Sequence, residues 1–304
     1  MMFYAGVLIE KGGGQVVIKE GDIVGRKSYG CDIYFKVMAI YAAEDGHTYA
    51  RLKGLDLRLE ATSRLDDLCK IDPVAINQYW LKVMRTTHDK MRHVFQRRQA
   101  EKQGCLLRAV KNGEEVESFD LPGTVLHVDG DKDYLEMCLT AYKQLHLTCY
   151  GYHIAEEKQA GEIYNLLVIH RPDILVVTGH DGLIKNASNY SDINSYHNSR
   201  HFVAAVQEAR RYEKSRDDLV IFAGACQSHY EAILAAGANF ASSPKRVLIH
   251  AYDPVFVVEK VAFTSIYDPI ALKDVIASTI TGFDGIGGLE TRGKYRLGLP
   301  KSLY

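Results

Sequence analysis

The fold of this chain is decided by two segments, Asp173-Ile-Leu-Val-Val-Thr-Gly-His180-Asp-Gly182 and Leu219-Val-Ile-Phe-Ala-Gly-Ala-Cys226. Each begins with an apolar, β-branched run of the kind that forms a buried parallel strand. Each then ends in small residues and one reactive side chain, an imidazole in the first and a thiol in the second. The residues between them suit a loop and an amphipathic helix, and such a crossover joins neighbouring parallel strands. We therefore expect His180 and Cys226 to share one edge of a sheet, where open α/β sheets bind ligands.

The flanking sequence continues this alternation of strand and helix. Its periodicity predicts further strands within residues 123–131, 147–154, 245–250 and 255–263, and helices over residues 132–145, 155–170, 199–211 and 228–238. Elements that alternate in this way form a three-layer α/β sandwich with a mostly parallel sheet. In the usual strand order, the strand ending at Asp129 lies between the next strand of the chain and the one that precedes His180. The glycine-rich, basic tail over residues 285–300 is expected to be irregular.

The first 70 residues differ in character from this region. Short apolar runs lie at residues 16–20, 32–41, 48–52 and 55–59, and turn signals separate them. This pattern favours a small β-barrel. The motif Gly21-Asp-Ile-Val-Gly-Arg26 resembles the opening of SH3-like and KOW-like barrels. Some barrels of this kind bind peptides or nucleic acid and others only pack against a neighbour, so both roles stay open.

A long helix is predicted between the two regions, over residues 71–104. Asp72 and Pro73 suit its start, and Gly104 suits its end. One face carries an apolar stripe, and the opposite face is basic, with Lys90, Arg92, Arg97, Arg98 and Lys102. That basic face is either a solvated surface between two domains, a docking surface for anions, or a segment where the chain is cut after Arg97 or Arg98. The resulting division is a barrel at 1–70, a helical linker at 71–104 and an α/β domain at 105–304.

Composition excludes several classes of protein. The 304 residues are 47% apolar, and 37 basic side chains balance 38 acidic ones, so the net charge indicates neither a nucleic-acid nor a membrane partner. No apolar run approaches the roughly 20 residues that cross a bilayer. The start, residues 1–10, turns acidic too early for a signal peptide, so we expect a cytoplasmic location.

The six cysteines form no CxxC pair, which argues against a zinc knuckle or a thioredoxin-type site. Cys138 and Cys149 are expected to be buried hydrophobes, and Cys31, Cys69 and Cys105 are expected to be inert. No cluster has the spacing of a metal site, so we expect no cofactor. Cys226 is the remaining thiol, and its position at a strand end is what distinguishes it.

The pair at the strand ends fits cysteine peptidase chemistry. A free thiol titrates near about 8.5, and a neighbouring imidazolium or a helix N-terminus lowers that value. His180 would activate the thiol of Cys226 and later protonate the leaving amine. The backbone N–H groups of Cys226 and of Gly182, or of Asp181 in place of Gly182, could form an oxyanion hole. Asp181 either hydrogen-bonds His180 or caps the following turn.

Two carboxylates follow the strand at 123–131. Asp129 and Asp131 lie at its carboxyl end, where a carboxylate can bind the guanidinium of a substrate arginine through two hydrogen bonds. Either could instead cap the helix that follows, and this alternative is stronger for Asp131. We expect substrate binding here, with Asp129 as the first choice.

His180 and Cys226 are 46 residues apart, and this order and spacing resemble the caspase-like peptidases, including legumain, clostripain and gingipain. The likeness covers about residues 123–265. It implies a caspase-like fold with His180 and Cys226 as the dyad and, as in arginine-directed members, cleavage after arginine. The chain departs from that pattern in having His-Asp-Gly where caspases have His-Gly, and Ala-Cys-Gln where they have Ala-Cys-Arg. Asp181 therefore stands where the second oxyanion donor is usually found.

A closer resemblance is to the YabG sporulation proteases of endospore-forming bacteria. It rests on the segments "GDIVGRKSYGCDIYFKV", "VTGHDG" and "FAGACQSHYEAI", and it extends over the whole chain. This resemblance implies that the protein processes spore coat and related proteins in the mother cell. It maps the nucleophile onto Cys226 and the histidine onto His180. Self-processing after Arg97 or Arg98 is a further expectation. Protein substrates are then the expected partners.

Two other functions are compatible with the sequence. A non-catalytic coat scaffold would use the barrel and basic helix to bind partners and would need no reactive thiol. A small-molecule amidase would use Cys226 as its nucleophile and would leave proteins intact. Alkylation of Cys226 near neutral pH would favour an enzyme over the scaffold.

Overall fold

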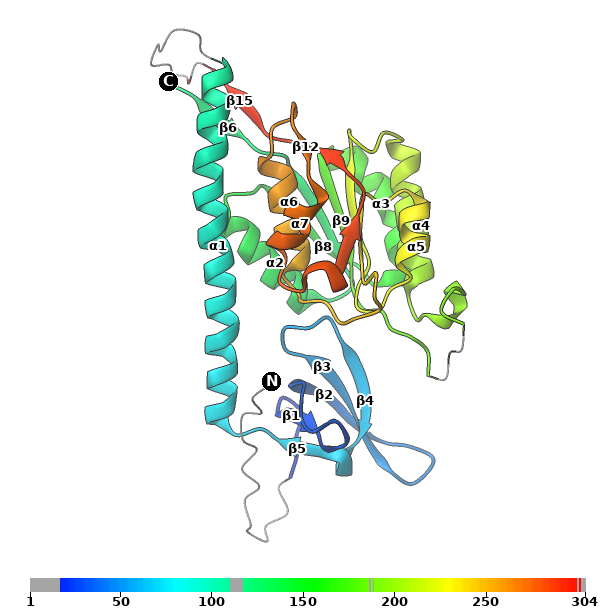
Figure 1. The fold of residues 1–304 in the computed structure, drawn as a ribbon. Helices are drawn as coiled ribbons and strands as arrows, with labels where there is room; N and C mark the ends of the chain where they lie inside the picture. Colours follow the sequence, from blue (N-terminus) through cyan, green and yellow to red (C-terminus); the bar gives the residue numbers. More distant parts are fainter. Residues whose placement is uncertain (1–16, 110–116, 186, 188, 300, 302–304) are drawn as a thin grey trace. The chain divides into compact units, whose positions relative to one another are not determined.

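The computed structural model describes residues 17–109, 117–185, 187, 189–299 and 301, without the side chains of 105–109 (Figure 1). Residues 1–10, which carry the signal-peptide argument, lie outside that part. So does the side chain of Cys105, which is expected to be inert. The chain forms two compact units, residues 1–55 with 61–76 and residues 56–60 with 77–304, which we call the N-terminal unit and the α/β unit. The segment Asp56–Glu60 thus belongs to the α/β unit, although its neighbours in sequence belong to the N-terminal unit.

The N-terminal unit is built on a five-stranded sheet of order β4-β3-β2-β1-β5. Its strands are β1 (Ile23–Arg26), β2 (Phe35–Ala42), β3 (Thr48–Gly54), β4 (Glu60–Arg64) and β5 (Leu68–Lys70). The strands expected near 32–41 and 48–52 are confirmed. The strand expected at 16–20 is wrong for the described residues 17–20, and the one expected at 55–59 forms only an isolated bridge at Leu57.

Two cysteines of the N-terminal unit are paired. Cys31 and Cys69 form a disulfide between residues 38 positions apart. The two are therefore not free thiols, because the turn after β1 brings Cys31 beside β5, where Cys69 lies.

The helix α1 (Pro73–Ala109) begins where Asp72 and Pro73 predict it, and Asp72 accepts a hydrogen bond from the backbone of Val74 (2.6 Å). Gly104 does not end it, since a single glycine costs a helix only about 1 kcal/mol. From Asn77 onward the helix belongs to the α/β unit. Across the described residues, no helix combines the length and the apolar composition that a membrane span needs.

The basic face of α1 is not simply solvated. Arg97 and Arg98 both form ion pairs with the buried Glu259, and Lys90 donates to two backbone carbonyls of the same unit. Val94 lies in the same packing surface and is buried. Arg97, Arg98 and Lys90 therefore attach the helix to the rest of the α/β unit.

The α/β unit contains a six-stranded sheet of order β13-β11-β10-β9-β7-β8. Its strands are β7 (Val125–Asp129), β8 (Cys149–His153), β9 (Ile174–Thr178), β10 (Val220–Ala223), β11 (Phe240–Ser242) and β13 (Ile286–Gly288). All neighbouring pairs are parallel except β11 with β13. The mostly parallel sheet and the order of its first four strands in sequence are as predicted.

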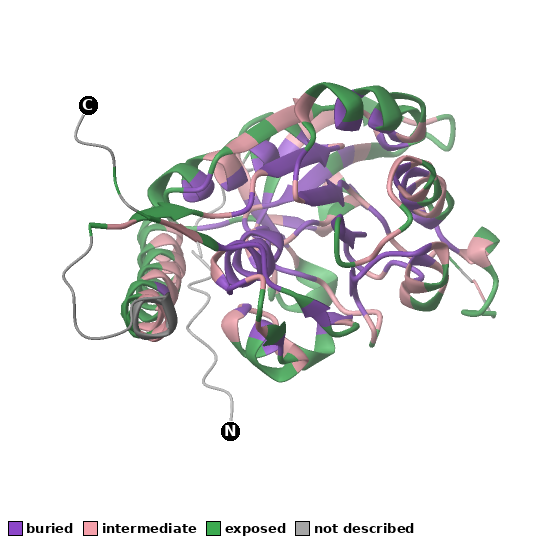
Figure 2. Ribbon diagram, turned by 90° about the horizontal axis from the view of Figure 1, so that it is seen from above, coloured by how far each residue is buried: buried purple, intermediate pink, exposed green. Residues whose placement is uncertain are grey.

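Helices cover both faces of this sheet, so the unit has three layers (Figures 1 and 2). One face packs on α3 (Glu156–His170), α4 (Ser199–Tyr212) and α5 (Tyr230–Ala236), and the other on α2 (Lys132–Gln144), α6 (Asp253–Phe263) and α7 (Leu272–Ser278). Each face has its own cluster of buried apolar side chains. Figure 2 shows the strands as the buried middle layer.

Three expectations for the C-terminal third are wrong. Residues 255–263 form the buried helix α6, since an apolar run without alternation fits a buried helix as well as a strand, and Pro254 favours a helix start. Residues 245–250 form a turn and an irregular segment, in which Arg246 has φ +56°, while the fifth strand is β11. The tail is not irregular throughout, because it forms β13, β14 (Thr291–Arg292) and β15 (Arg296–Gly298), which pair with β11, β12 (Pro269–Ile270) and β6 (Phe119–Leu121).

Candidate active site

The loops after β9 and β10 leave the sheet at the same edge. These strands are parallel neighbours, and Val177 pairs with Ala223 at their carboxyl ends. His180 follows the end of β9 by two residues, and Cys226 follows the end of β10 by three. The strands are therefore adjacent as predicted, but the surroundings of the two side chains differ.

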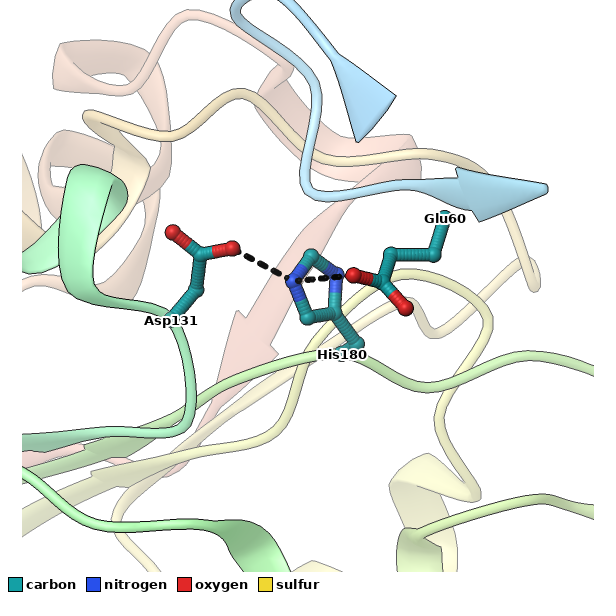
Figure 3. A group of neighbouring side chains, drawn as sticks. All are labelled: Glu60, Asp131 and His180. Atoms are coloured by element: carbon teal, nitrogen blue, oxygen red, sulfur yellow. Dashed lines mark hydrogen bonds and ion pairs between the residues drawn. The ribbon is translucent and has the colours of Figure 1, made fainter. Parts of the chain in front are cut away.

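The His180 imidazole lies between the carboxylates of Asp131 and Glu60 (Figure 3). Its Nε2 lies 2.8 Å from Asp131 Oδ2 and 3.7 Å from Glu60 Oε1. Its ring also packs against Tyr134, with 5.6 Å between ring centroids. The Nδ1 atom is buried and has no hydrogen-bond partner among the described residues. One ring nitrogen is thus bonded to a carboxylate, and the other has no hydrogen-bond partner among the described residues.

The backbone of His180 is fixed as well. Its N–H donates to Glu156 Oε1 (2.6 Å), and its carbonyl accepts from the Asn198 side chain (2.9 Å). Glu156 approaches this loop so closely that a Cβ at Gly179 would lie 2.2 Å from its carboxylate. Gly179 therefore lets the Glu156 carboxylate reach the backbone, which sets the direction of the imidazole.

Asp131 has two roles in the structure. It is the N-cap of α2, where Oδ1 accepts from the backbone N–H groups of Asp133 (2.9 Å) and Tyr134 (3.0 Å). Its other oxygen, Oδ2, faces His180. The expected cap is therefore present, and the same carboxylate orients the histidine.

Cys226 is completely buried. Its Sγ accepts a hydrogen bond from the backbone N–H of Ile249 (3.2 Å), and within the described residues this backbone, not His180, is the hydrogen-bond partner of the thiol. Burial raises the pKa of the Cys226 thiol to about 12. The flanking residues Gly224 (φ +108°) and Gln227 (φ +55°) place the loop in a conformation that L-residues rarely adopt. In this state the thiol is protonated at neutral pH.

Asp181 joins the two loops. Its Oδ2 accepts from Ser199 Oγ (2.5 Å) and Ser228 Oγ (2.8 Å), and its Oδ1 accepts from the backbone of Gly182 (2.9 Å) and Asn198 (2.8 Å). Of the two roles considered for Asp181, capping the turn matches these bonds, and hydrogen-bonding the His180 ring does not. The Gly182 N–H, expected in an oxyanion hole, is here bonded to Asp181.

Asp129 is buried at the end of β7 and already has partners. Its Oδ2 lies 2.7 Å from Arg58 Nη1 and accepts from Thr178 Oγ1 (2.8 Å). His127 lies 3.3 Å from the same oxygen, and Oδ1 accepts from the backbone of Asp131. Although burial opposes ionisation, the Arg58 charge and these hydrogen bonds hold the pKa of Asp129 below its usual value. A guanidinium is therefore bound where a substrate arginine was expected, and it comes from the chain itself.

Three side chains also form a possible metal site. One ligand atom each from Glu60, Asp131 and His180 lies within 4.8 Å of the others (Figure 3). An imidazole with two carboxylates suits Zn²⁺ and related cations. The observed bonding, with His180 Nε2 directed to Asp131, is also that of a histidine fixed by a carboxylate.

The sequence did not point to Arg58, Glu60, Glu156 or Tyr134. Arg58 and Glu60 lie in a stretch with strand-like alternation and reach the site only through the packing of residues 56–60 with the other unit. Glu156 stands in the first turn of a helix that follows a strand, which is a signal that could have been used. Tyr134 is one of 19 tyrosines, and nothing in the sequence distinguishes it.

Comparison with known proteins identifies the family. The family model described as YabG peptidase U57 matches residues 19–300. A curated relative, the sporulation-specific protease YabG of Bacillus subtilis (strain 168), is 42% identical over 290 residues, which cover 92% of this chain and 97% of that protein. No solved structure matches the chain. The chain therefore belongs to the YabG peptidase family.

Proposed function

We propose that the chain is a cysteine endopeptidase of sporulation in which Cys226 is the nucleophile, His180 is the base, and cleavage follows arginine. The observation that carries this proposal is the state of His180. Asp131 binds its Nε2, while Nδ1 is buried without a partner among the described residues, at the sheet edge where Cys226 also lies. A fixed imidazole with one unpaired nitrogen is suited to take up and return a proton.

The reaction follows from these roles. The thiol proton passes to His180 Nδ1, and Sγ attacks the carbonyl carbon of the scissile bond. The C–N bond breaks, His180 gives the proton to the leaving amine, and the acyl group remains on Sγ as a thioester. Water then attacks the thioester while His180 takes its proton. The product leaves as a carboxylic acid, and the proton on His180 restores the thiol.

The nucleophile has to be activated when substrate binds. With its pKa raised to about 12 by burial, Cys226 is unreactive at rest. Substrate entry that turns Sγ from the Ile249 backbone toward His180 would allow the proton transfer. This arrangement would protect the thiol from oxidation and from cleaving other proteins between encounters.

The oxyanion formed by the attack needs two donors. The backbone N–H of Cys226 supplies one. Because the Gly182 N–H is bonded to Asp181 Oδ1, we assign the second to the backbone N–H of Asp181 itself, which is the alternative that the sequence left open.

Specificity for arginine is supported by Asp129. This carboxylate is fully buried and already binds a guanidinium, that of Arg58. Replacing that guanidinium by the side chain of a substrate would conserve the charge pair. Asp131, the second carboxylate expected to bind substrate, serves better as the group that positions His180.

Finer features of the family resemblance belong to the same proposal. The sheet order and the positions of His180 and Cys226 support a caspase-like arrangement, and the N-terminal sheet supports an SH3-like barrel. The relative's name supports action on proteins during sporulation. We propose spore coat and related proteins as substrates, the mother cell as the location, and self-processing as a secondary activity.

The proposal is tested by comparing wild type, Cys226→Ala and Cys149→Ala on protein and peptide substrates that contain arginine. Cys149 is a matched control, since it is a free thiol with a raised pKa on β8, away from the β10 loop. We expect Cys226→Ala to lose on the order of 10⁶-fold in kcat, as other nucleophile deletions do, and Cys149→Ala to remain active. Identical fragments from wild type and Cys226→Ala would refute the assignment of the nucleophile.

A further inference from the structure

The segment Asp56–Glu60 is bound to the α/β unit along its backbone. Leu57 forms an antiparallel bridge with His250. On either side of that bridge, Arg58 N–H donates to the Ile249 carbonyl (3.1 Å) and Ala251 N–H donates to the Asp56 carbonyl (2.7 Å). This is how an extended peptide adds to an exposed strand, with backbone hydrogen bonds supplying affinity.

The side chain of Arg58 fills a closed pocket beside this strand. Its Nη1 lies 2.7 Å from Asp129, and its Nη2 lies 3.4 Å from the Ala251 carbonyl and 3.5 Å from Cys138 Sγ. The guanidinium carbon stands 5.3 Å from the centroid of the Tyr134 ring, whose hydroxyl donates to the Leu57 carbonyl (2.6 Å). Arg58 is 0% exposed. A carboxylate, a carbonyl and an aromatic ring thus form a pocket suited to one guanidinium.

Both proposed catalytic groups adjoin the bound segment. Ile249 accepts the Arg58 N–H and also donates its own N–H to Cys226 Sγ (3.2 Å). Two residues further along the segment, Glu60 Oε1 lies 3.7 Å from His180 Nε2. The Arg58–Leu59 peptide bond therefore lies between a residue that contacts the nucleophile and a residue beside the base.

Building on the proposed function, we propose that Asp56–Glu60 occupies the substrate cleft as an internal arginyl peptide and has to leave before a protein substrate can bind. Arg58 takes the place of the arginine that precedes the cleaved bond. Asp129, Tyr134, Cys138 and the Ala251 carbonyl form the arginine pocket, and Ile249–Ala251 form the segment that binds the substrate backbone. The substrates it admits are extended segments with an arginine and an apolar residue before it.

The occupancy also accounts for the closed state of Cys226. An internal peptide bound by Ile249 covers the residue that holds the thiol. A substrate competes with a segment that is always present. Its apparent dissociation constant therefore equals the intrinsic one divided by the fraction of molecules in which the cleft is open. Activity would therefore rise wherever a partner or a modification draws the segment away.

The test separates binding from catalysis by using full-length chains that carry Cys226→Ala. The probe is the peptide acetyl-Leu-Asp-Leu-Arg-amide, which repeats the sequence of residues 55–58. We expect Arg58→Ala in this background to bind the probe at least about ten-fold more tightly than Cys226→Ala alone, because the pocket is vacated. Arg64→Ala, which removes an exposed arginine from the same part of the sequence, is the control and should leave binding unchanged. Equal binding with and without Arg58 would overturn the proposal.

Loss of Arg58 leaves Asp129 buried without its cation and could unfold the chain. Asp56→Asn is the second variant, since it weakens the contact of the segment with His250 Nε2 (3.3 Å) and keeps Arg58. Asp56→Asn should bind the probe about two- to five-fold more tightly than the chain with Cys226→Ala alone. Unchanged or weaker binding in a folded Asp56→Asn protein would count against the proposal.

Hydrolysis by chains that retain Cys226 distinguishes the failure of this inference from the failure of the proposed function. With an arginyl fluorogenic peptide, Arg58→Ala should have a lower KM than wild type. If Arg58→Ala binds the probe better but hydrolyses nothing, the cleft is correctly assigned and the peptidase mechanism is wrong. If wild type cleaves and Arg58→Ala is no better in KM, the mechanism stands and the internal peptide is refuted.

Discussion

The two loops at the carboxyl edge of the sheet hold His180 and Cys226 through different kinds of contact. The loop after β9 holds His180 by side-chain carboxylates, Asp131 at the ring and Glu156 at the backbone, and leaves the ring 14% exposed. The loop after β10 buries Cys226 completely and holds its sulfur by the backbone of Ile249. The proposed base is thus held by carboxylates, whereas the proposed nucleophile is buried with a raised pKa. Variants that remove His180 or its partner Asp131 should change the chemistry, and variants of Asp181, which links the loops, should change the stability.

The largest effect is expected from His180→Ala. Without the base, the thiol keeps its proton, so kcat should fall on the order of 10⁴- to 10⁶-fold on an arginyl peptide. His88→Ala, which removes an exposed histidine of α1, is the control. Comparable activity of the two variants, measured as initial rates, would show that the β9 loop does not supply the base.

Asp131 allows its two roles to be separated. Asp131→Ser keeps a side chain that can cap α2 but removes the carboxylate from His180, so kcat should fall about 10²- to 10³-fold with nearly unchanged stability. Asp131→Ala should lose the same activity and in addition about 1 kcal/mol of unfolding free energy. Thermal melts and initial rates of Asp131→Ser and Asp131→Ala separate the capping role from the orientation of His180. An active Asp131→Ser would mean that the carboxylate serves only as a cap.

Asp181 should matter for stability more than for proton transfer. Asp181→Ala removes a buried carboxylate that accepts four hydrogen bonds from both loops, and the unfolding free energy should fall by about 3 kcal/mol. Asp192→Ala, which removes an exposed cap of the short helical turn Ile193–Ser195, should cost about 1 kcal/mol or less. Urea unfolding of both variants measures the difference. Equal losses would argue against Asp181 as the link between the loops.

The smallest effect concerns alkaline pH. The pKa of Cys226 is raised to about 12 in the folded chain, so above the ordinary thiol pKa the unfolded chain loses this proton while the folded chain retains it. Unfolding is then favoured as pH rises, and this group should lower stability by about 2 kcal/mol at pH 10. Cys226→Ala should lose correspondingly less stability between pH 8 and pH 10. The same slope in both proteins would mean that Cys226 is more exposed than the structure has it.

The sequence predicted the part of the fold that periodic patterns specify. Long amphipathic helices and the strands before His180 and Cys226 were found because burial on one or both faces leaves a regular pattern. Residues 245–263 were misassigned because a buried helix and a buried strand are equally apolar. The short strands of the tail are fixed by pairing with β11, β12 and β6, which no local pattern records.

The candidate site was predictable only where a residue type marks its own chemistry. A histidine and a cysteine at strand ends stand out, and so does a carboxylate before a helix. The partners of these groups did not, because Arg58 and Glu60 are distant in sequence and ordinary in their local context. Asp181 was ambiguous for a physical reason, since a carboxylate beside a histidine can bind either the ring or the backbone of the next turn.

The membership of Asp56–Glu60 in the α/β unit has a consequence for how the chain can be divided. A fragment that starts at residue 77 would contain Asp129 but not Arg58, and breaking a buried ion pair by removing one partner costs about 3–5 kcal/mol. The two units therefore cannot be exchanged or inherited as independent modules. Insertions within these five residues should not be tolerated, so this short stretch should constrain the family's length variation.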